Sequence, residues 1–444
     1  MNRVTTLPDR VTIDQLAQQG CTDAQIASQV GWKVATVRKW RRRARRAGRQ
    51  GLISPLGRPK AGALSGYPKP MVETLRAWRV AHPGWGPKTL SVELEKDERF
   101  QQRRRPHPSS IARFLKAAGL TRSYQRCTGL PQSLPPRVTL PHQEWEMDSQ
   151  GYGYVPHVGA IGLINVADVL SKAKVASYPC LVGHKRARHR LRTEDYQLVL
   201  RLAFTEWGLP DRIATDRDSV FYENTSKSPF PTRCHLWLLA LGIDLRFGHP
   251  GRATERPTVE RSHQTFDWQA LDGQTFAAWD SLRAYLEQRR HFLNYDLPCR
   301  SLDDRPPLLA YPQALQPRRL YRPEWEPELL DLTHVYDYLA KGRWFRKASP
   351  TGVVSLGNYC YGLGISWARE VVEINFDPLD IHFVFRSANG QQTKRFPPQR
   401  VTPTDLMGEM GPLLNLPQFQ LALPYSWDEW RLIRLSETFQ GTTL

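Results

Sequence analysis

The feature that most constrains the fold of this 444-residue chain is a change of pattern near residue 142. From there to residue 300, short apolar segments rich in β-branched residues, such as GAIGLINVADVL and KAKVASYPCLV, precede alternating amphipathic and apolar segments. The apolar segments rich in β-branched residues are typical of neighbouring strands in a buried sheet. The alternating amphipathic and apolar segments are typical of helices that alternate with strands. This order predicts a mixed α/β layer over residues 142–300.

The N-terminal segment, residues 1–50, has a different pattern. Thr22 is a suitable N-cap, Ile26 and Val30 lie four residues apart on one helical face, and Gly31 can end the helix. A second, strongly basic helix follows, with the sequence ATVRKWRRRARR. Two short helices around a glycine-containing turn predict a helix-turn-helix domain.

The net charge of +19 is concentrated in the same part of the chain, because residues 1–60 contain 13 Lys/Arg and 3 Asp. Clustered positive charge predicts contact with a polyanion such as DNA. The second helix would then lie in the major groove, with Thr36, Arg38 and Lys39 near base edges. A helical hairpin with a merely solvated basic face is the alternative. Phosphate contacts are expected from the other arginines of this helix, which are Arg41, Arg42, Arg43, Arg45 and Arg46.

A second helical unit is predicted between two linkers. Residues 51–70 are rich in Gly, Pro and Ser, and residues 126–141 are rich in Pro. Both compositions are typical of linkers. Between them, residues 71–125 predict helices around a basic loop. We interpret this unit as a second DNA-binding domain, with a structural spacer as the alternative. The basic loop consists of Arg103, Arg104 and Arg105.

The C-terminal third changes pattern once more. Residues 301–348 are Pro-rich and are predicted to be a linker with one helical stretch. Residues 349–402 alternate with period two around two turn signals, Asn389-Gly390 and Gly357-Asn358, which predict hairpins of a small β-barrel. Residues 403–444 form a tail without a clear pattern, which could dock a partner protein.

Cysteine usage and hydropathy indicate the compartment. The six cysteines are scattered without a C-x-x-C pair, which argues against a disulfide framework and a structural zinc site. The N-terminus lacks the apolar run of a signal peptide, and no segment approaches the ~18 apolar residues of a membrane span. We therefore expect a cytoplasmic, nucleoid-associated protein with no membrane partner.

Three carboxylates occupy positions that could form a metal site. Asp148 is expected at the end of the first strand, Asp216 at the end of the strand RIATD, and Glu260 in the first turn of the helix TVERSHQTF. Such positions converge at one edge of an α/β sheet. Carboxylate oxygens suit Mg²⁺, and two such ions can hold a scissile phosphate. With 43 acidic residues in the chain, the sequence around the three carboxylates must supply the specificity.

That surrounding sequence resembles the DDE transposase and retroviral integrase superfamily, especially bacterial insertion-sequence transposases with an integrase catalytic core. Trp145 precedes Asp148, as a Trp does in the family, and TDRDSVF (Thr215 to Phe221) matches the pattern of its second Asp. The third element is LGIDLRFGHPGRATERPTVERSHQTF, and FLNY around Asn294 also fits. The resemblance covers roughly residues 140–310, and it implies an RNase H-like core.

The resemblance also implies an activity. Asp148, Asp216 and Glu260 would be both the catalytic residues and the ligands of two Mg²⁺ ions, for which Mn²⁺ can substitute. The enzyme would be a transposase, which cleaves DNA at the transposon ends by phosphodiester hydrolysis and joins them to a target by transesterification. Its partners would be double-stranded DNA and further copies of the chain in a homo-multimer on DNA. An accessory ATPase that chooses the target is left open.

The expected fold class is therefore a multidomain α+β protein. It would consist of helix-turn-helix N-terminal domains, an RNase H-like α/β catalytic core over residues 142–300, and a small C-terminal β-barrel.

The chain departs from the family in its spacing and its loops. Arg217 and Asp218 replace the Asn-Gly that often follows the second Asp, so Asp218 could add negative charge near the metal ions. The 43 residues between Asp216 and Glu260 are more than many members have, and the extra residues are expected in the polar loop YENTSKSPFPTR.

Two other carboxylates compete for roles in the site. Glu255 is a rival of Glu260, and Asp168 is a lesser rival for the first position. His263 projects from the same helical face as Glu260, three residues later. It touches DNA or steadies the site, or else it is only a polar partner of Glu260.

Two alternative functions stay open beside the transposase. One is a DNA-binding regulator with an inactive integrase-like core, although all three carboxylates are present. The other is an RNase H-like nuclease without joining activity, although two DNA-binding domains suit the recognition of DNA ends better. A structural chromatin protein is a weaker alternative, because it needs no clustered carboxylates.

Overall fold

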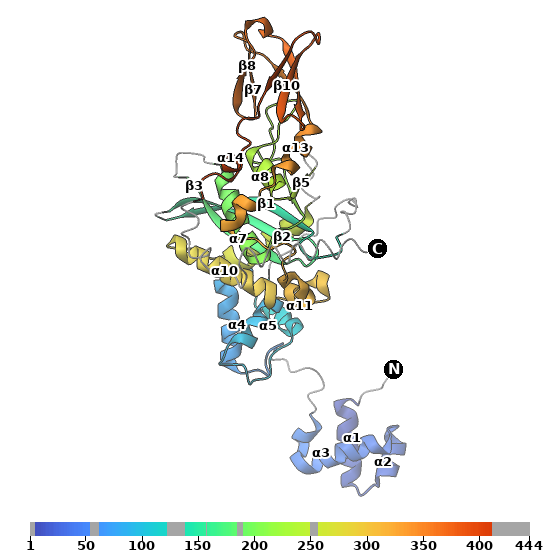
Figure 1. The fold of residues 1–444 in the computed structure, drawn as a ribbon. Helices are drawn as coiled ribbons and strands as arrows, with labels where there is room; N and C mark the ends of the chain where they lie inside the picture. The colour runs from blue at the N-terminus through green and yellow to red at the C-terminus, as the bar shows by residue number, and fades with distance from the viewer. Residues whose placement is uncertain are drawn as a thin grey trace.

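The computed structural model describes residues 5–53, 62–121, 138–156, 158–183, 190–248 and 256–410. These residues form a mixed α+β protein, as predicted, with helices toward the N-terminus and two larger sheets further along the chain (Figure 1). No helix in these ranges is long and apolar enough to cross a membrane.

Three helices make up the N-terminal unit, and the predicted local signals are confirmed. Thr22 caps the second helix in a capping box with Gln25, and Gly31 ends it in the left-handed region at φ 69°. Val37 and Trp40 are buried, so the basic helix uses its apolar stripe to pack. The helices are α1 (Leu7–Gln18), α2 (Asp23–Val30) and α3 (Val34–Leu52).

A second helical unit packs against the rest of the molecule. Its own core includes Met71, Leu90 and Ile111. The Trp85 Nε1 donates to the Gln269 carbonyl at 3.1 Å, which fastens the unit to the segment after α9. The helices are α4 (Lys69–Ala81), α5 (Pro87–Lys96) and α6 (Pro108–Ala117).

The central sheet has five strands in the order β3-β2-β1-β4-β5. The first three strands along the chain pair antiparallel, whereas β4 and β5 run parallel to β1. β1 pairs with β4 only over residues 144–146 and continues well beyond that pairing. The strands are β1 (Glu144–Val155), β2 (Gly159–Asp168), β3 (Lys174–Gly183), β4 (Arg212–Thr215) and β5 (Asp244–Phe247).

Helices cover both faces of this sheet. Successive residues of a strand point to opposite faces, so the buried Trp145 packs with Phe204 and Trp237 on one face. On the other face, Leu163 of β2 packs with Phe266. The helices are α7 (Thr193–Trp207) and α8 (Arg233–Ala240) on the first face, with α9 (Pro257–Phe266), the π-helical turn η2 (Asp267–Leu271) and α10 (Trp279–Tyr295) on the second.

The segment after α10, which was predicted to be a linker, contains several short helices. Glu326 is fully buried and forms two hydrogen bonds with Arg201 of α7, at 2.7 and 2.9 Å. The segment is therefore held against the core by a buried ion pair. Its elements are η3 (Arg300–Leu302), α11 (Pro307–Ala310), η4 (Pro312–Leu315), η5 (Pro323–Trp325), α12 (Glu326–Leu329) and α13 (Leu332–Ala340).

The C-terminal strands do not close into the predicted barrel within the described residues. They form a four-stranded sheet, β11-β10-β9-β6, and a separate hairpin, β7-β8. Four short strands are too few to curl into a closed cylinder. Phe230 of the core instead packs against Trp344 and Phe383 of the sheet.

Both predicted hairpins are present at the C-terminal end. Gly357-Asn358 joins β7 to β8 and Asn389-Gly390 lies between β10 and β11. The elements are β6 (Arg343–Lys347), β7 (Val353–Leu356), β8 (Tyr359–Gly362), η6 (Ile365–Trp367), β9 (Val371–Asp377), β10 (His382–Ser387), β11 (Thr393–Phe396) and α14 (Pro403–Met407). The predicted tail thus begins with α14, and residues 411–444 lie outside the described residues.

Candidate active site

The candidate site begins on β1, at the point where its pairing with β4 stops. Strand alternation places Glu144, Glu146 and Asp148 on one face, away from Trp145. Asp148 was expected at the end of its strand, but it lies inside the 12-residue β1 and pairs with Asn165 of β2. Its side chain is 19% exposed, so this carboxylate is accessible at the sheet edge.

Asp216 follows directly after β4, as predicted. The parallel register pairs Glu144 with Arg212 and Glu146 with Ala214, so two further residues bring Asp216 level with Asp148. Burial raises the pKa of Asp216, and the neighbouring negative charge of Asp148 raises it further. The Asp216 Oδ1 accepts a hydrogen bond from the Asp218 backbone N–H at 3.1 Å, which opposes the rise.

Glu260 lies in the first turn of α9, and a residue that sequence reasoning missed holds this helix in place. The buried Glu146 accepts hydrogen bonds from the backbone N–H groups of Thr258 and Val259, at 2.7 and 2.9 Å. It therefore satisfies the free donors of the first turn from the neighbouring strand. The available signal was its position two residues before Asp148, on the same face of a strand.

The pKa values of the carboxylates indicate that they influence one another. Burial raises the pKa of Glu260, and the negative charge of Asp148 adds to this effect. Asp148 therefore acts on both Asp216 and Glu260. Asp148 on β1 thus lies within electrostatic reach of Asp216 after β4 and of Glu260 on α9.

Arg256 is the second residue that sequence reasoning missed. It is buried at the N-terminal end of α9, where its Nη1 donates to the Met147 carbonyl at 3.0 Å and lies 3.4 Å from the Asp148 Oδ2. Its positive charge lowers the pKa values of Asp216 and Glu260, against the effect of burial. A guanidinium group thus compensates part of the negative charge of the site.

His263 is half-buried and faces the same region. Burial lowers its pKa, while the charges of Asp148 and Asp267 and a hydrogen bond to the Asp148 main chain oppose that change. Its Nε2 has no hydrogen-bond partner among the described residues. The groups that act on His263 thus belong to Asp148 and its surroundings, and contact with DNA stays a prediction.

The two rival carboxylates have different outcomes. Asp168 is fully buried and accepts hydrogen bonds from the backbone N–H groups of His142 and Ser171, both at 2.7 Å, so it stabilises the turn after β2. Because Asp168 pairs with Trp145, it points to the face opposite Asp148. Glu255 lies outside the described residues.

The donor chemistry of the site suits a hard divalent ion. Asp148, Asp216 and Glu260 offer carboxylate oxygens, which Mg²⁺ prefers. Within the described ranges, however, no three such side chains lie close enough together to hold one ion. Arg256 is the cation that the structure places beside one of these carboxylates, Asp148.

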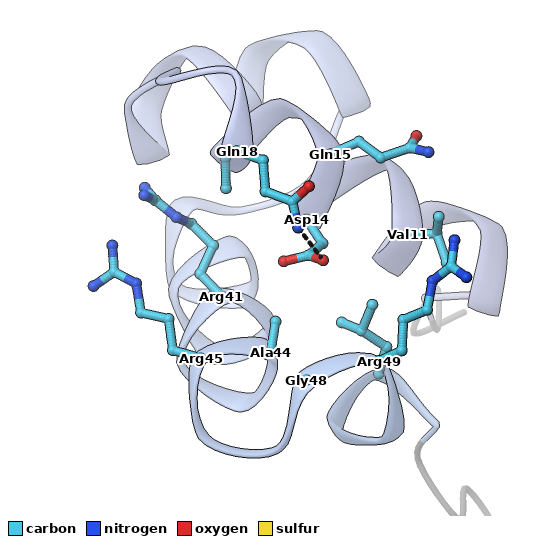
Figure 2. A pocket seen from close by; sticks show the side chains of 11 residues that line it. Val11, Asp14, Gln15, Gln18, Arg41, Ala44, Arg45, Gly48 and Arg49 are labelled. Atoms are coloured by element: carbon cyan, nitrogen blue, oxygen red, sulfur yellow. Dashed lines mark hydrogen bonds between the residues drawn. The ribbon is translucent and has the colours of Figure 1, made fainter.

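The residues predicted to bind DNA lie in three separate places. On α3, Arg38 and Arg41 both pair with Asp23 of α2, and Arg43 stacks on Trp40. A cavity of about 390 Å³ separates α1 from α3, and Figure 2 shows Arg41, Arg45 and Arg49 around it. Thr36 is half-buried, whereas Lys39, Arg42, Arg45 and Arg46 are exposed.

The other two places belong to different parts of the chain. Arg103, Arg104 and Arg105 are exposed in the loop between α5 and α6, and Arg105 pairs with Glu95 at 2.8 Å. His263, on α9, is the predicted DNA contact nearest the carboxylates.

No protein-family model matches the chain. The integrase chain in a simian T-cell lymphotropic virus intasome in complex with PP2A regulatory subunit B56 gamma is 13% identical, with a TM-score of 0.32 over 73% of this chain and 95% of the other. Two HTLV-2 integrase catalytic cores in complex with magnesium are 14% and 16% identical, with TM-scores of 0.28 and 0.24. They cover 39% and 36% of this chain, and 99% and 90% of their own. The similar structures are retroviral integrases.

Proposed function

We propose that the chain is a DDE-type DNA transposase that cleaves transposon ends and joins them to target DNA. The observation that carries the proposal is the arrangement of Asp148, Asp216 and Glu260. The strand register brings the first two level, and Glu146 anchors the helix that bears the third. The sequence motifs around the same three residues support the same function.

In this proposal, Asp148, Asp216 and Glu260 would hold two Mg²⁺ ions, or Mn²⁺ in their place. When bound, such ions activate the attacking oxygen and stabilise the leaving oxygen of a phosphodiester. The protein orients the ligands. Glu146 fixes the first turn of α9, and Tyr196 of α7 hydrogen-bonds to the Ser149 side chain next to Asp148.

We propose that DNA binds to the surface of α3 that carries arginines without a carboxylate partner among the described residues. Arg42, Arg45 and Arg46 have no carboxylate partner among the described residues and can neutralise phosphates. The α1–α3 and α4–α6 units would bind the element ends as helix-turn-helix domains, around an RNase H-like core. Two ends must be held together, so we propose a homo-multimer on DNA, in the cytoplasm and at the nucleoid.

A strand-transfer assay tests the proposal. Labelled duplexes copied from the regions flanking the gene are incubated with wild type or Asp216→Asn, with Mg²⁺ or Mn²⁺. Asp244→Asn is the matched control, because Asp244 is an exposed carboxylate at the start of β5. We expect metal-dependent joined products from wild type and Asp244→Asn, and none from Asp216→Asn.

Two other outcomes would support the alternatives. Cleaved products without joined products, from wild type with either metal, would indicate a nuclease. DNA binding without cleavage or joining would indicate a regulator with an inactive core.

A further inference from the structure

Arg256 is unusual because it is a buried cation inside a cluster of acidic groups. The residue is 7% exposed, and its Nη1 contacts both the Met147 carbonyl and the Asp148 carboxylate. It comes directly before the first helical residue of α9, four residues before Glu260. Its guanidinium group is therefore in the space between β1 and the catalytic helix.

The charge of Arg256 reaches four titratable groups around this space. It acts on Asp216, on Glu260 and on His263, and it forms an ion pair with Asp148. The other charges that act here are those of Asp218 beside Asp216 and Asp267 beside His263, both negative. One guanidinium group thus offsets several carboxylates, which in its absence would repel one another in a partly buried site.

A divalent ion bound by the same carboxylates would also reduce the repulsion between their negative charges. The guanidinium and the ion are both positive, so they repel each other when they share these ligands. We propose that Arg256 competes with the divalent ion for the carboxylates, and that a DNA phosphate relieves this competition by binding the guanidinium group. This inference rests on the proposed function.

The geometry of arginine explains why a phosphate can take over this contact. The planar guanidinium group presents a fork of N–H donors that matches two phosphate oxygens. In the structure, its contact with Asp148 is long, at 3.4 Å between the Nη1 and the Oδ2. A phosphate would offer a bidentate partner, which is stronger than one long contact. Metal binding and DNA binding would therefore help each other, and by linkage each would raise the affinity of the other equally.

The test measures Mn²⁺ binding to the full chain by electron paramagnetic resonance, with no turnover involved. Wild type, Arg256→Gln and Arg256→Lys are titrated without DNA and with a duplex from the flanking regions. Arg261→Gln is the matched control, since Arg261 is an exposed arginine on the same helix. Circular dichroism checks that each variant is folded.

Without DNA, we expect Arg256→Gln to bind Mn²⁺ about tenfold more tightly than wild type, within the 5–150-fold range typical of coupled sites. DNA should then tighten Mn²⁺ binding about tenfold in wild type and hardly at all in Arg256→Gln. Arg256→Lys keeps the charge but loses the fork. It should bind Mn²⁺ like wild type without DNA and gain less from DNA, so it tests the idea even if Arg256→Gln does not fold.

Equal or weaker Mn²⁺ binding by Arg256→Gln, in a protein whose wild type joins DNA, would overturn this inference and leave the proposed function standing. Absence of both Mn²⁺ binding and joined products in wild type would overturn the proposed function itself. An equal effect of Arg261→Gln would show that general surface charge, not the position of Arg256, is responsible.

Discussion

Two arginine–carboxylate clusters lie in the same α+β core and differ in how completely their charges are matched. Arg201 pairs with Glu326 through two short hydrogen bonds, and Glu326 also accepts from Trp237 at 2.7 Å and from Tyr321. Arg256, by contrast, faces several carboxylates and reaches Asp148 at only 3.4 Å. A fully satisfied pair fixes one structure, whereas an incompletely matched cluster keeps its groups available for a ligand.

The largest expected effect concerns the satisfied pair. Glu326→Gln leaves the buried Arg201 charge without a counter-charge, so we expect a loss of about 3–5 kcal/mol in the free energy of unfolding. Urea denaturation followed by tryptophan fluorescence measures it, with and without Mg²⁺. The loss should be the same with and without the metal, because Glu326 binds Arg201, Trp237 and Tyr321 rather than any of the three carboxylates. Arg201→Met with Glu326→Leu removes both charges and should cost less, and an equal cost would contradict the pair's role.

The next effect separates a proposed ligand from the residue that positions it. Glu260→Gln should lower the joining rate by about 10²–10³-fold, the scale of losing one electrostatic contact in a transition state. Glu146→Gln keeps an oxygen acceptor for the first turn of α9 and loses only charge. We expect about a tenfold loss for it, comparable to the low end of the effect of supporting residues around metal ligands. Single-turnover rates measure both, and equal losses would show that Glu146 does more than position α9.

The incomplete charge matching should also appear in the pH dependence of stability. Burial raises the pKa of Asp216 above its unfolded value, so the folded state binds more protons between the two values. The stability from this group is therefore present below the unfolded pKa and is lost as pH rises through the folded pKa. Asp216→Asn removes this pH-dependent loss of stability, because the amide carries no charge at any of these pH values. Without metal, we expect the variant to unfold at a higher temperature than wild type at neutral pH.

The difference between Asp216→Asn and wild type should shrink as the pH falls through this window. Thermal unfolding of both proteins in a series of buffers measures it, with Asp244→Asn as the control that should show no such trend. A wild type more stable than Asp216→Asn at neutral pH without metal would contradict the raised pKa.

The smallest effect extends the comparison to the surface of α3. Arg42, Arg45 and Arg46 have no carboxylate partner among the described residues, whereas Arg41 pairs with Asp23. Replacing the three arginines by Gln should reduce the slope of log affinity against log salt by about 3, since each phosphate contact contributes about 0.9. Fluorescence anisotropy with duplex DNA measures the slope. Arg41→Gln alone should change it less than any one of the three.

Local signals in the sequence were sufficient for the ends of α2 and for the two C-terminal hairpins, but not for the short helices between residues 300 and 340. Thr22 and Gly31 bound the second helix because a cap and a left-handed glycine act on their own neighbours. Asn389-Gly390 makes its hairpin for the same reason. No closed barrel forms among the described residues, because closure depends on how many strands pair and where, which turn residues do not specify.

In the candidate site, too, local motifs predicted some features and only the structure gave the others. Motifs within a few residues of Asp148, Asp216 and Glu260 were enough to nominate these carboxylates. The partners of Glu146 and Asp168 could not be predicted from them. Glu146 contacts a helix that lies 112 and 113 residues further along the chain. Asp168, at the end of β2, binds His142, which lies 26 residues earlier and just before β1.

The sequence by itself therefore determined the helix caps and the hairpin turns, because these depend on contacts between near neighbours, and it nominated the three carboxylates as candidates. Only the tertiary structure decided the local charge balance. Arg256 has no distinguishing motif, and its position among the carboxylates arises because β1, β4 and α9 meet there. Which charges share a buried space depends on how distant segments pack, and packing joins residues that the chain keeps far apart.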